Sequence, residues 1–313
     1  MLTPLDFLSD LTNPLLSFLP KALIVSLLAA VVCGAVGCHV ILRGMTFIGD
    51  AVTHAVFPGI ALAFVLQGSL VLGGILAGTL TAILIAVVSQ IRRLGEDSVI
   101  GVFFVAAFAL GIVIISRSPG YTGSLESFLF GSITGIPDSA VLSSAVFAAL
   151  VLAVLTVLHP QLVAVSLDRE TARALGLPVL LLDIALYVLV TLAVVMSIQT
   201  IGNVLVLALL VTPAAAARML TDRLVPMMVL AAGLGAASAV VGLYLSWAID
   251  LPTGGTIVLV ATAVFAIAAV AGPRHGMLRP LLQRRRRARP QRAAQAPGTA
   301  AAEAASAPAA PLA

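Results

Sequence analysis

The sequence predicts an all-α membrane protein with about nine membrane-spanning helices. Hydrophobic residues make up 61% of the 313 residues and charged residues only 10%, whereas soluble globular proteins carry about 25% charged residues. The mean hydropathy is +1.16. Apolar runs of about 20 residues, the length of a helix that crosses a bilayer, recur along the chain. Because a helix satisfies its own backbone hydrogen bonds, such runs suit the membrane, and a water-soluble fold is excluded.

Each apolar run is expected to form one span. The runs lie at 21–42, 46–66, 70–89, 98–116, 139–158, 179–198, 202–219, 225–248 and 254–272. Residues 1–20 contain no Lys or Arg, so they lack the basic region of a signal peptide and are expected to form a short extracytoplasmic lead-in. Residues 117–138 are rich in Gly and Pro and indicate a loop with a short re-entrant or surface helix. An eight-span arrangement with one re-entrant segment is the alternative.

The distribution of basic residues predicts the orientation, because cytoplasmic connections are enriched in Lys and Arg. With nine spans and a cytoplasmic C-terminus, the N-terminus lies outside, and 15 of the 17 basic residues fall on the cytoplasmic side. Only Lys21 and Arg117 fall outside. The membrane-spanning region then covers 21–275. It is followed by a tail, 276–313, that begins Arg-rich, continues Ala/Pro-rich, and is expected to be disordered and cytoplasmic.

The longest connection expected on the cytoplasmic side covers 159–178. Within it, Ser166 or Asp168 can cap a short helix, and Gly176 followed by Pro178 would end it. The sequence therefore predicts a short helix within 167–177 that carries apolar residues beside charges. Such a helix either lies on the bilayer surface or docks on a cytoplasmic partner.

Two ionisable residues stand inside the second apolar run. Asp50 and His54 are four residues apart, which places them on one face of a helix. An Asp in hydrocarbon costs about 2.5–3.5 kcal/mol on insertion scales, so such residues usually mark a function. A carboxylate oxygen and an imidazole nitrogen suit manganese, iron(II) or zinc. The alternative is structural: Asp50 pairs with Arg43, and His54 is a core histidine. Pro58 follows on the same helix and can kink it.

Four segments in this order resemble one family. They are Leu42–Gly59, Leu129–Ser132, Asp168–Gly176 and Gly202–Ala217. Together they resemble the permease (transmembrane) subunits of ABC-type divalent metal importers, which move manganese, zinc or iron. Within that family, Ala51 together with Pro58-Gly59 is more similar to the manganese and iron members than to the zinc members. Two features depart from the pattern: His39, where apolar residues are usual, and the long Arg/Ala/Pro tail.

The resemblance implies a multi-pass protein of the cytoplasmic membrane that works with partners. These are a cytoplasmic ABC ATPase, a second permease copy, most simply in a homodimer, and an extracytoplasmic metal-binding protein. It implies that Asp50 and His54 line the metal pathway and that 167–177 is the coupling helix on the ATPase. The coupling residues would be Asp168, Glu170, Ala172 and Gly176. The metal ion would be the transported substrate, with no permanently bound cofactor, and no nucleic-acid partner is expected.

The chain itself is not expected to be an enzyme. It contains no G-x-x-x-x-G-K-[ST] loop, and its only lysine is Lys21, so it cannot bind ATP through a P-loop. It also contains no H-E-x-x-H motif. ATP hydrolysis would belong to a separate ATPase chain. Two other functions are open: a proton-coupled secondary metal transporter, and an ABC permease for a metal chelate.

The remaining polar and proline residues receive secondary expectations. Glu126, Gln199 and Asn203 are candidates for an outer gate, and Pro213 is expected to bend or break the seventh span. The other expectations are structural. Asp183 would pair with Arg173 or reach the membrane surface, His39 would be a core residue, and Cys33 and Cys38 would be small packing residues.

Overall fold

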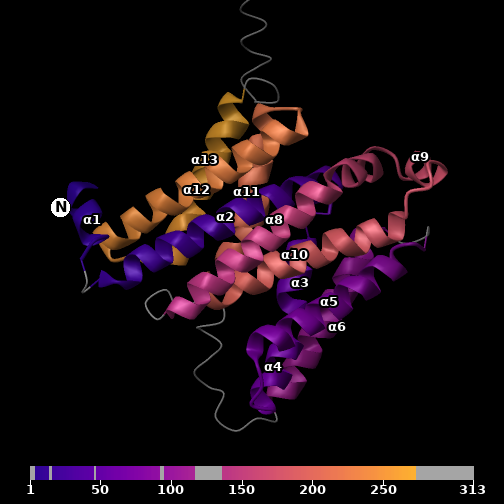
Figure 1. Cartoon of the computed structure of the whole chain (residues 1–313), viewed down its shortest axis with the longest axis horizontal. Coiled ribbons are helices and arrows are strands. Elements are labelled where there is room, and N and C mark those ends of the chain that lie inside the picture. The colour runs from indigo at the N-terminus through magenta and orange to yellow at the C-terminus, as the bar shows by residue number, and fades with distance from the viewer. Residues whose placement is uncertain (1–3, 14–15, 46, 92–94, 117–135, 273–313) are drawn as a thin grey trace, which may run out of the picture.

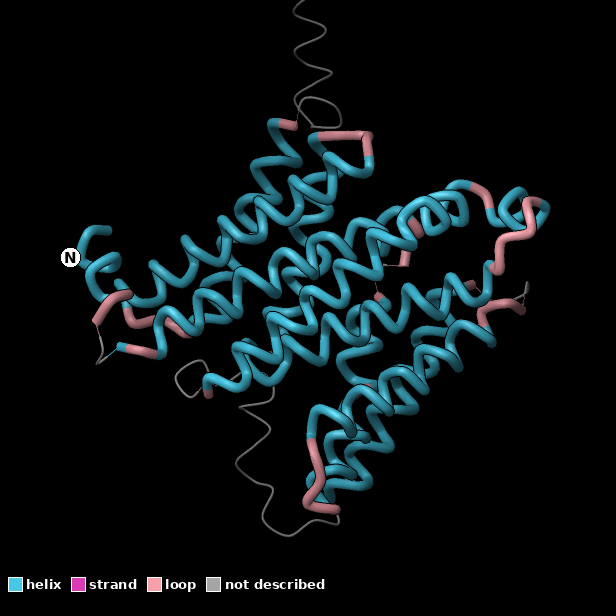
Figure 2. Tube along the Cα trace, viewed as in Figure 1, coloured by secondary structure: helices cyan, strands magenta, loops and turns pink. Residues whose placement is uncertain are grey.

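The structure, a computed structural model, describes residues 4–13, 16–45, 47–91, 95–116 and 136–272. All of the regular structure in these ranges is helical (Figure 2). The helices are α1 (Pro4–Asp10), α2 (Phe18–Leu42), α3 (Ile48–Ala55), α4 (Phe57–Val65), α5 (Leu70–Val88), α6 (Glu96–Ser116), α8 (Asp138–Leu167), α9 (Arg169–Ala174), α10 (Val179–Ile201), α11 (Asn203–Leu220), α12 (Leu224–Ile249) and α13 (Thr253–Ala271).

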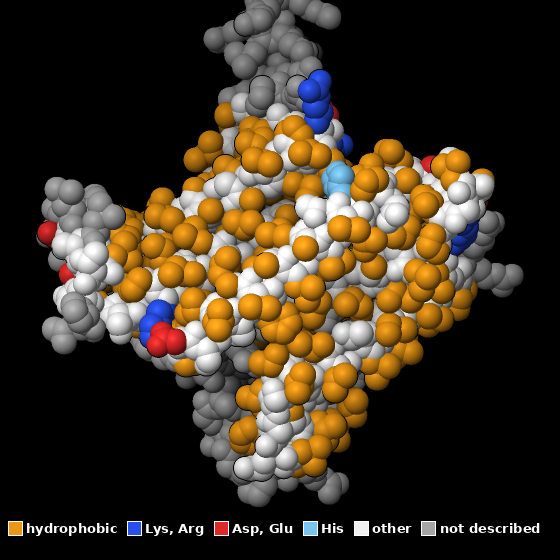
Figure 3. All heavy atoms as spheres, viewed as in Figure 1, with side chains coloured by type: hydrophobic (Ala, Val, Ile, Leu, Met, Phe, Trp, Pro, Cys, Tyr) orange, Lys and Arg blue, Asp and Glu red, His pale blue; other side chains and the backbone are white. Residues whose placement is uncertain are grey.

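The predicted fold class is confirmed. Within the described ranges, nine helical segments are long and apolar enough to cross a membrane, and α3 and α4 together form one of them. Their sides are covered by apolar side chains, and the few charged groups visible on the face in Figure 3 lie toward the ends of helices. The expected loop or surface helix at 117–138 falls largely outside the described residues, as does the tail from 276.

The helices form two groups joined by a central pair (Figure 1). On one side, α2 packs with α11 and α12, and α13 packs against both α11 and α12. On the other, α3 and α4 pack against α5 and α6. Helices α8 and α10 contact each other and α2, and α10 also reaches α5 and α3. The end of α2 and the start of α3 therefore lie where the two groups meet.

Helices α2 and α8 run side by side in the same direction. Near their starts, Lys21 Nζ lies 2.7 Å from Asp138 Oδ1. At their ends, Arg43 Nε donates a 3.0 Å hydrogen bond to Ser166 Oγ. The parallel pairing is expected for the first and fifth spans of a chain that crosses the membrane at each turn.

Helix α8 is longer than the sequence predicts. The apolar run predicts a span that ends near 158. The helix instead continues through Pro160 to Leu167, since Leu162 and Val165 beyond the proline are buried in the core. At 30 residues, it is about 45 Å long, which exceeds the roughly 30 Å hydrocarbon core. Its extension carries α9 to one extreme of the molecule, opposite α1 (Figure 1).

The N-terminal lead-in contains a helix of its own, α1. Its Phe7 is buried and makes edge-to-face ring contacts with Tyr244 and Trp247 of α12, at centroid distances of 5.6 and 5.5 Å. The start of the chain is therefore packed against the end of α12.

One residue turns the chain between α10 and α11. Gly202 has φ +83° and ψ 161°, a conformation that is essentially restricted to glycine. It allows Asn203 to begin α11 directly after Ile201 ends α10.

Small residues bring α2 into close contact with α11. A Cβ added at Gly37 would lie 1.9 Å from the Leu210 backbone oxygen, far inside van der Waals contact. Close backbone approach through small residues is the usual way in which membrane helices associate, since no hydrophobic force drives them together in lipid.

We predict that Gly37→Ala destabilises the protein by about 1–3 kcal/mol, the usual cost of overpacking a well-packed site. Gly233→Ala in α12 is the matched control, because a Cβ there meets nothing within 4 Å. Because alanine is more favourable than glycine inside a helix, Gly233→Ala should be neutral or should stabilise the protein by up to about 1 kcal/mol. Thermal unfolding of the purified protein in detergent measures both, and equal melting temperatures for the two variants would contradict the packing described.

Candidate functional site

Asp50 and His54 lie on one face of α3, as their spacing predicts. Asp50 is in the first turn and His54 in the last. The His54 Nε2 atom lies 3.6 Å from Asp50 Oδ1, and the two side chains are 20% and 41% exposed. The carboxylate and the imidazole therefore lie next to each other and are both partly exposed.

Aromatic rings of α6 hold the His54 imidazole in place. Phe104 and Phe108 each contact it edge to face at a centroid distance of 4.9 Å, and their own rings are stacked. His54 Nδ1 is buried and has no hydrogen-bond partner among the described residues. The ring is thus fixed by apolar contacts, while its Nε2 faces the Asp50 carboxylate.

This geometry suits a shared divalent ion. Two ligand atoms at about 2.0–2.2 Å from one ion lie about 2.8–3.6 Å apart at octahedral or tetrahedral angles. The observed 3.6 Å between Nε2 and Oδ1 is at the upper end of that range. Within the described residues, no group of three or more His, Cys, Asp or Glu is placed to hold a metal ion. One copy of the chain therefore offers two protein ligands at this position.

The structural alternative for Asp50 does not match the structure. Arg43, its expected partner, instead directs Nη1 to Asp183 Oδ1 at 2.7 Å. Among the described residues, the ion pair found for the Asp50 carboxylate is the one with His54. No guanidinium partner of Asp50 is found among the described residues.

The two prolines of interest have different local effects. Helix α3 ends at Ala55 and α4 begins at Phe57, so the second span is interrupted at Val56, with Pro58 in the first turn of α4. Helix α11 runs unbroken through Pro213, contrary to the expectation that it might be divided there. The interruption in the second span lies within one turn of His54.

Helix α9 occupies part of the predicted 167–177 segment and is capped at both ends. The Asp168 carboxylate accepts a 2.9 Å hydrogen bond from the Glu170 backbone N–H and another from the Thr171 hydroxyl. These bonds hold the pKa of Asp168 below its usual range, the Thr171 bond having the larger effect. The cap is therefore charged at neutral pH, and its contribution is lost only as the pH falls through that lowered pKa. Of the two predicted caps, Asp168 is the one used.

The end of α9 follows the Schellman pattern. The Leu177 N–H donates to the Ala172 oxygen and the Gly176 N–H to the Arg173 oxygen, both at 3.0 Å. Gly176 has φ +78°, the left-handed conformation that this pattern requires. Local sequence alone thus determines where this short helix stops.

The sides of α9 differ in exposure. Ala172 is buried, whereas Leu167 and Leu175, which flank the helix, are 82% and 72% exposed. Glu170 lies in the first turn. Two large apolar side chains at the far end of the molecule are therefore uncovered in a single copy of this chain.

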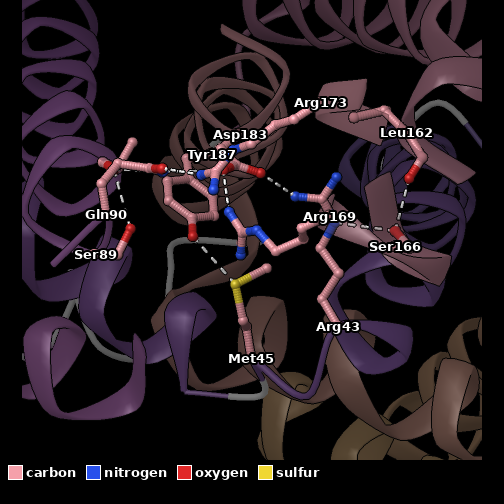
Figure 4. A network of polar contacts seen from close by, with 11 residues as sticks. Arg43, Met45, Ser89, Gln90, Leu162, Ser166, Arg169, Arg173, Asp183 and Tyr187 are labelled. Carbon is pink, nitrogen blue, oxygen red and sulfur yellow. Dashed lines mark hydrogen bonds and ion pairs between the residues drawn. The ribbon is translucent and has the colours of Figure 1, made fainter. Parts of the chain in front are cut away.

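A buried carboxylate links α9 to the ends of other helices (Figure 4). Asp183 of α10 is fully buried and pairs through one oxygen with Arg43, which follows α2, and through the other with Arg169 of α9. Arg43 is itself 5% exposed and also binds Ser166 near the end of α8. Four elements thus meet at one carboxylate.

Two further contacts extend this network. Gln90, just after α5, approaches Asp183 at 3.4 Å and accepts a 2.6 Å hydrogen bond from Arg173 Nη2. One turn along α10, the Tyr187 hydroxyl donates to Met45 Sδ at 3.2 Å. The expected Asp183–Arg173 pair is therefore replaced by pairs with Arg43 and Arg169. Sequence spacing did not predict Arg43 as a partner of Asp183, because the two residues are 140 positions apart in the chain.

Of the three outer-gate candidates, the structure describes the side chain of Asn203 alone, so the outer gate stays a prediction. Asn203 is buried at the start of α11, and its Oδ1 has no partner among the described residues. Gln199 belongs to α10, but its side chain is outside the described set, and Glu126 lies wholly outside it.

Cys33, Cys38 and His39 are buried in α2, as expected of packing residues. The His39 ring contacts the ring of His159 in α8 edge to face at 5.5 Å. Sequence analysis did not anticipate this pair, because the extension of α8 past Pro160 was not foreseen.

Comparisons with known proteins are consistent along nearly the whole described region. A model of the ABC 3 transport family matches residues 16–272. The chain is 40% identical over 262 residues to the manganese transport system membrane protein MntC of Halalkalibacterium halodurans. The aligned region covers 84% of this chain and 90% of that protein. It is 36% identical over 262 residues to the chelated iron transport system membrane protein YfeC of Yersinia pestis, covering 84% and 89%.

A solved structure shares the fold. PsaBC from Streptococcus pneumoniae, solved in complex with a Fab, superposes with a TM-score of 0.78 at 35% sequence identity. The match covers 88% of this chain and 99% of that one.

We predict that Asp183→Ala destabilises the protein by about 3–5 kcal/mol, because it leaves the buried guanidinium group of Arg43 without its counter-charge. Asp138→Ala is the matched control: its carboxylate pairs with Lys21 but is 89% exposed, and an exposed pair contributes about 0–1 kcal/mol. Thermal unfolding in detergent compares the two. Equal losses of stability in the two variants would show that the buried Asp183 ion pair stabilises the protein no more than the exposed Asp138 pair does.

Proposed function

Because the chain belongs to the ABC 3 transport family, we propose that it is the permease subunit of an ATP-driven importer that carries a divalent metal ion across the cytoplasmic membrane. The observation that carries this proposal is the Asp50–His54 pair on one face of α3, 3.6 Å apart and partly exposed. Manganese is the proposed substrate, with iron(II) as the next candidate. The names of the relatives support this choice, as does the mixed oxygen and nitrogen ligand pair.

The site is suited to transient binding of a transported ion rather than to permanent binding of an ion. Two protein ligands bind an ion weakly, and conduction requires an ion to leave as well as enter. A second copy of the chain, placed so that both α3 helices face the pathway, would bring the protein ligands to four, with water or backbone oxygens completing the shell. Pro58, one turn from the ligands, cannot donate a backbone hydrogen bond, so the second span is weakest where α3 meets α4.

We assign ATP hydrolysis to a separate ABC ATPase. This chain has no P-loop. Its α9 offers a capped, rigid helix flanked by the exposed Leu167 and Leu175. An ATPase docked on α9 would cover these side chains, and Asp168, Glu170, Ala172 and Gly176 would shape that contact.

The proposed orientation places α9 and the tail in the cytoplasm and α1 outside. Basic residues support it: Arg43, Arg169 and Arg173 gather at the α9 end, whereas Lys21 and Asp138 lie at the opposite end of α2 and α8. An extracytoplasmic metal-binding protein would deliver the ion at the α1 end. Glu126, Gln199 and Asn203 remain proposed contributors to an outer gate.

We predict that Asp50→Ala and His54→Ala each abolish most metal uptake. The reduction should exceed the roughly 10–100-fold cost of losing an outer-shell partner, because a first-shell ligand is removed. Mn²⁺ uptake by proteoliposomes that hold the complete importer measures it, at equal protein content. Asp97→Ala, at the exposed start of α6, is the control.

The same vesicles separate this proposal from a proton-coupled transporter. Uptake should require the ATPase and ATP and should not occur with the permease alone under a pH gradient. Wild-type rates in both Asp50 and His54 variants would remove the metal pathway, and gradient-driven uptake without the ATPase would remove the ATP-driven assignment.

We also predict that Leu175→Asp weakens binding of the ATPase by about tenfold or more, since a charge would replace an apolar contact at the centre of the docking surface. Co-purification of the ATPase with the tagged permease measures the loss. Leu251→Asp, between α12 and α13, is the control for an exposed leucine elsewhere. Unchanged ATPase recovery with Leu175→Asp would argue against docking at α9.

A further inference from the structure

We infer that the Asp183 carboxylate is the junction through which movement of α9 reaches the ion-binding helix α3. This inference rests on the proposed function, in which the ATPase docks on α9 and the ion passes Asp50 and His54. It assigns a positioning role to Arg169, Asp183 and Arg43, none of which faces the ion pathway.

The first step is that α9 has few other attachments. Its backbone packs mainly against its sequence neighbours α8 and α10. A cavity of about 150 Å³ lies beside it, lined by Leu42, Arg43, Val165, Ser166, Leu167 and Arg169. Helix α9 is therefore not embedded in the bundle. Two side chains of α9 bind other elements: Arg169 binds Asp183 of α10, and Arg173 binds Gln90, which follows α5.

The second step is that the same carboxylate holds the segment before α3. Arg43 binds the other Asp183 oxygen at 2.7 Å, and its side chain is almost completely buried. Gly44 follows with φ +72°, and Met45, fully buried, accepts a hydrogen bond from Tyr187. Asp183 and Tyr187 are one turn apart on α10, so a single face of α10 fixes this segment at two points.

The ion pairs that join Arg169, Asp183 and Arg43 are suited to transmit a movement of α9 rather than to absorb it. A buried ion pair resists separation, because each charge left unpaired in an apolar bundle is costly. Two guanidinium groups share one carboxylate here, so a shift of Arg169 changes the field and the space at Arg43. Met45 lies only five residues before Asp50. A displaced α9 thus has a short route to the ion ligands through Asp183 and Arg43.

The decisive variant is Arg169→Gln, which cuts the α9 link but leaves the Arg43–Asp183 pair in place. Because Arg169 is 34% exposed, the protein should still fold. We expect the number of Mn²⁺ ions imported per ATP hydrolysed to fall about tenfold, within the range reported for coupling residues. Assembly with the ATPase and the Mn²⁺ concentration for half-maximal uptake should stay unchanged. Arg169→Lys should restore much of the coupling, since it keeps the charge.

The matched control is Arg218→Gln. Arg218 is 38% exposed and pairs with Asp222 four residues on, within its own segment. A second readout follows the route itself: hydrogen exchange of peptides spanning Arg43 to Asp50, in the complete importer with and without ATP and vanadate. In the wild type, nucleotide should change this exchange, and Arg169→Gln should remove the change although the ATPase remains bound.

Two results would overturn the inference: an unchanged ratio of ions to ATP in Arg169→Gln, or a nucleotide response of the Arg43–Asp50 peptides that survives the substitution. Either can occur while the wild-type importer still takes up Mn²⁺ with ATP, which would leave the proposed function standing. If the wild type shows no ATP-dependent Mn²⁺ uptake in the same vesicles, the proposed function itself fails.

Discussion

The structure depends on how one buried negative charge is compensated. Asp183 lies in an apolar bundle where an unpaired carboxylate would be unfavourable by several kcal/mol. Its compensation comes from Arg43 and Arg169, which belong to elements far apart in the sequence. That requirement fixes the end of α2 against α10, sets α9 beside both, and leaves α3 to begin a few residues later. The neighbouring Ser166, Gln90 and Tyr187 then complete the arrangement.

Asp50 is a carboxylate in the same bundle, but its surroundings differ from those of Asp183. Its nearest charged neighbour among the described residues is His54, and its side chain is 41% exposed. The arginine that the sequence places closest, Arg43, is committed to Asp183 instead. The pairing of Arg43 with Asp183 therefore supports the proposal that Asp50 and His54 bind the transported ion.

Sequence reasoning succeeded where local physics decides the outcome. The spans followed from apolar run length, and the caps of α9 followed from Asp168 and Gly176. It failed where tertiary packing decides. Pro160 did not end α8, because buried residues beyond it stabilise the extension. The partners of Asp183 were missed because Arg43 lies 140 residues away, and no periodicity records such a contact. The spacing of Asp50 and His54 predicts that they lie on one face of a helix. It does not predict that the rings of Phe104 and Phe108 contact His54.

The central claim, that the transported ion passes between Asp50 and His54, can be tested by pulsed electron paramagnetic resonance of Mn²⁺ bound to the complete importer. Mn²⁺ is paramagnetic, and a coordinated imidazole nitrogen gives a characteristic coupling. The account predicts that this nitrogen coupling is present in the wild type and absent in His54→Gln, in which the protein still folds and binds its ATPase. Nitrogen coupling of the same strength in His54→Gln would show that the ion binds elsewhere.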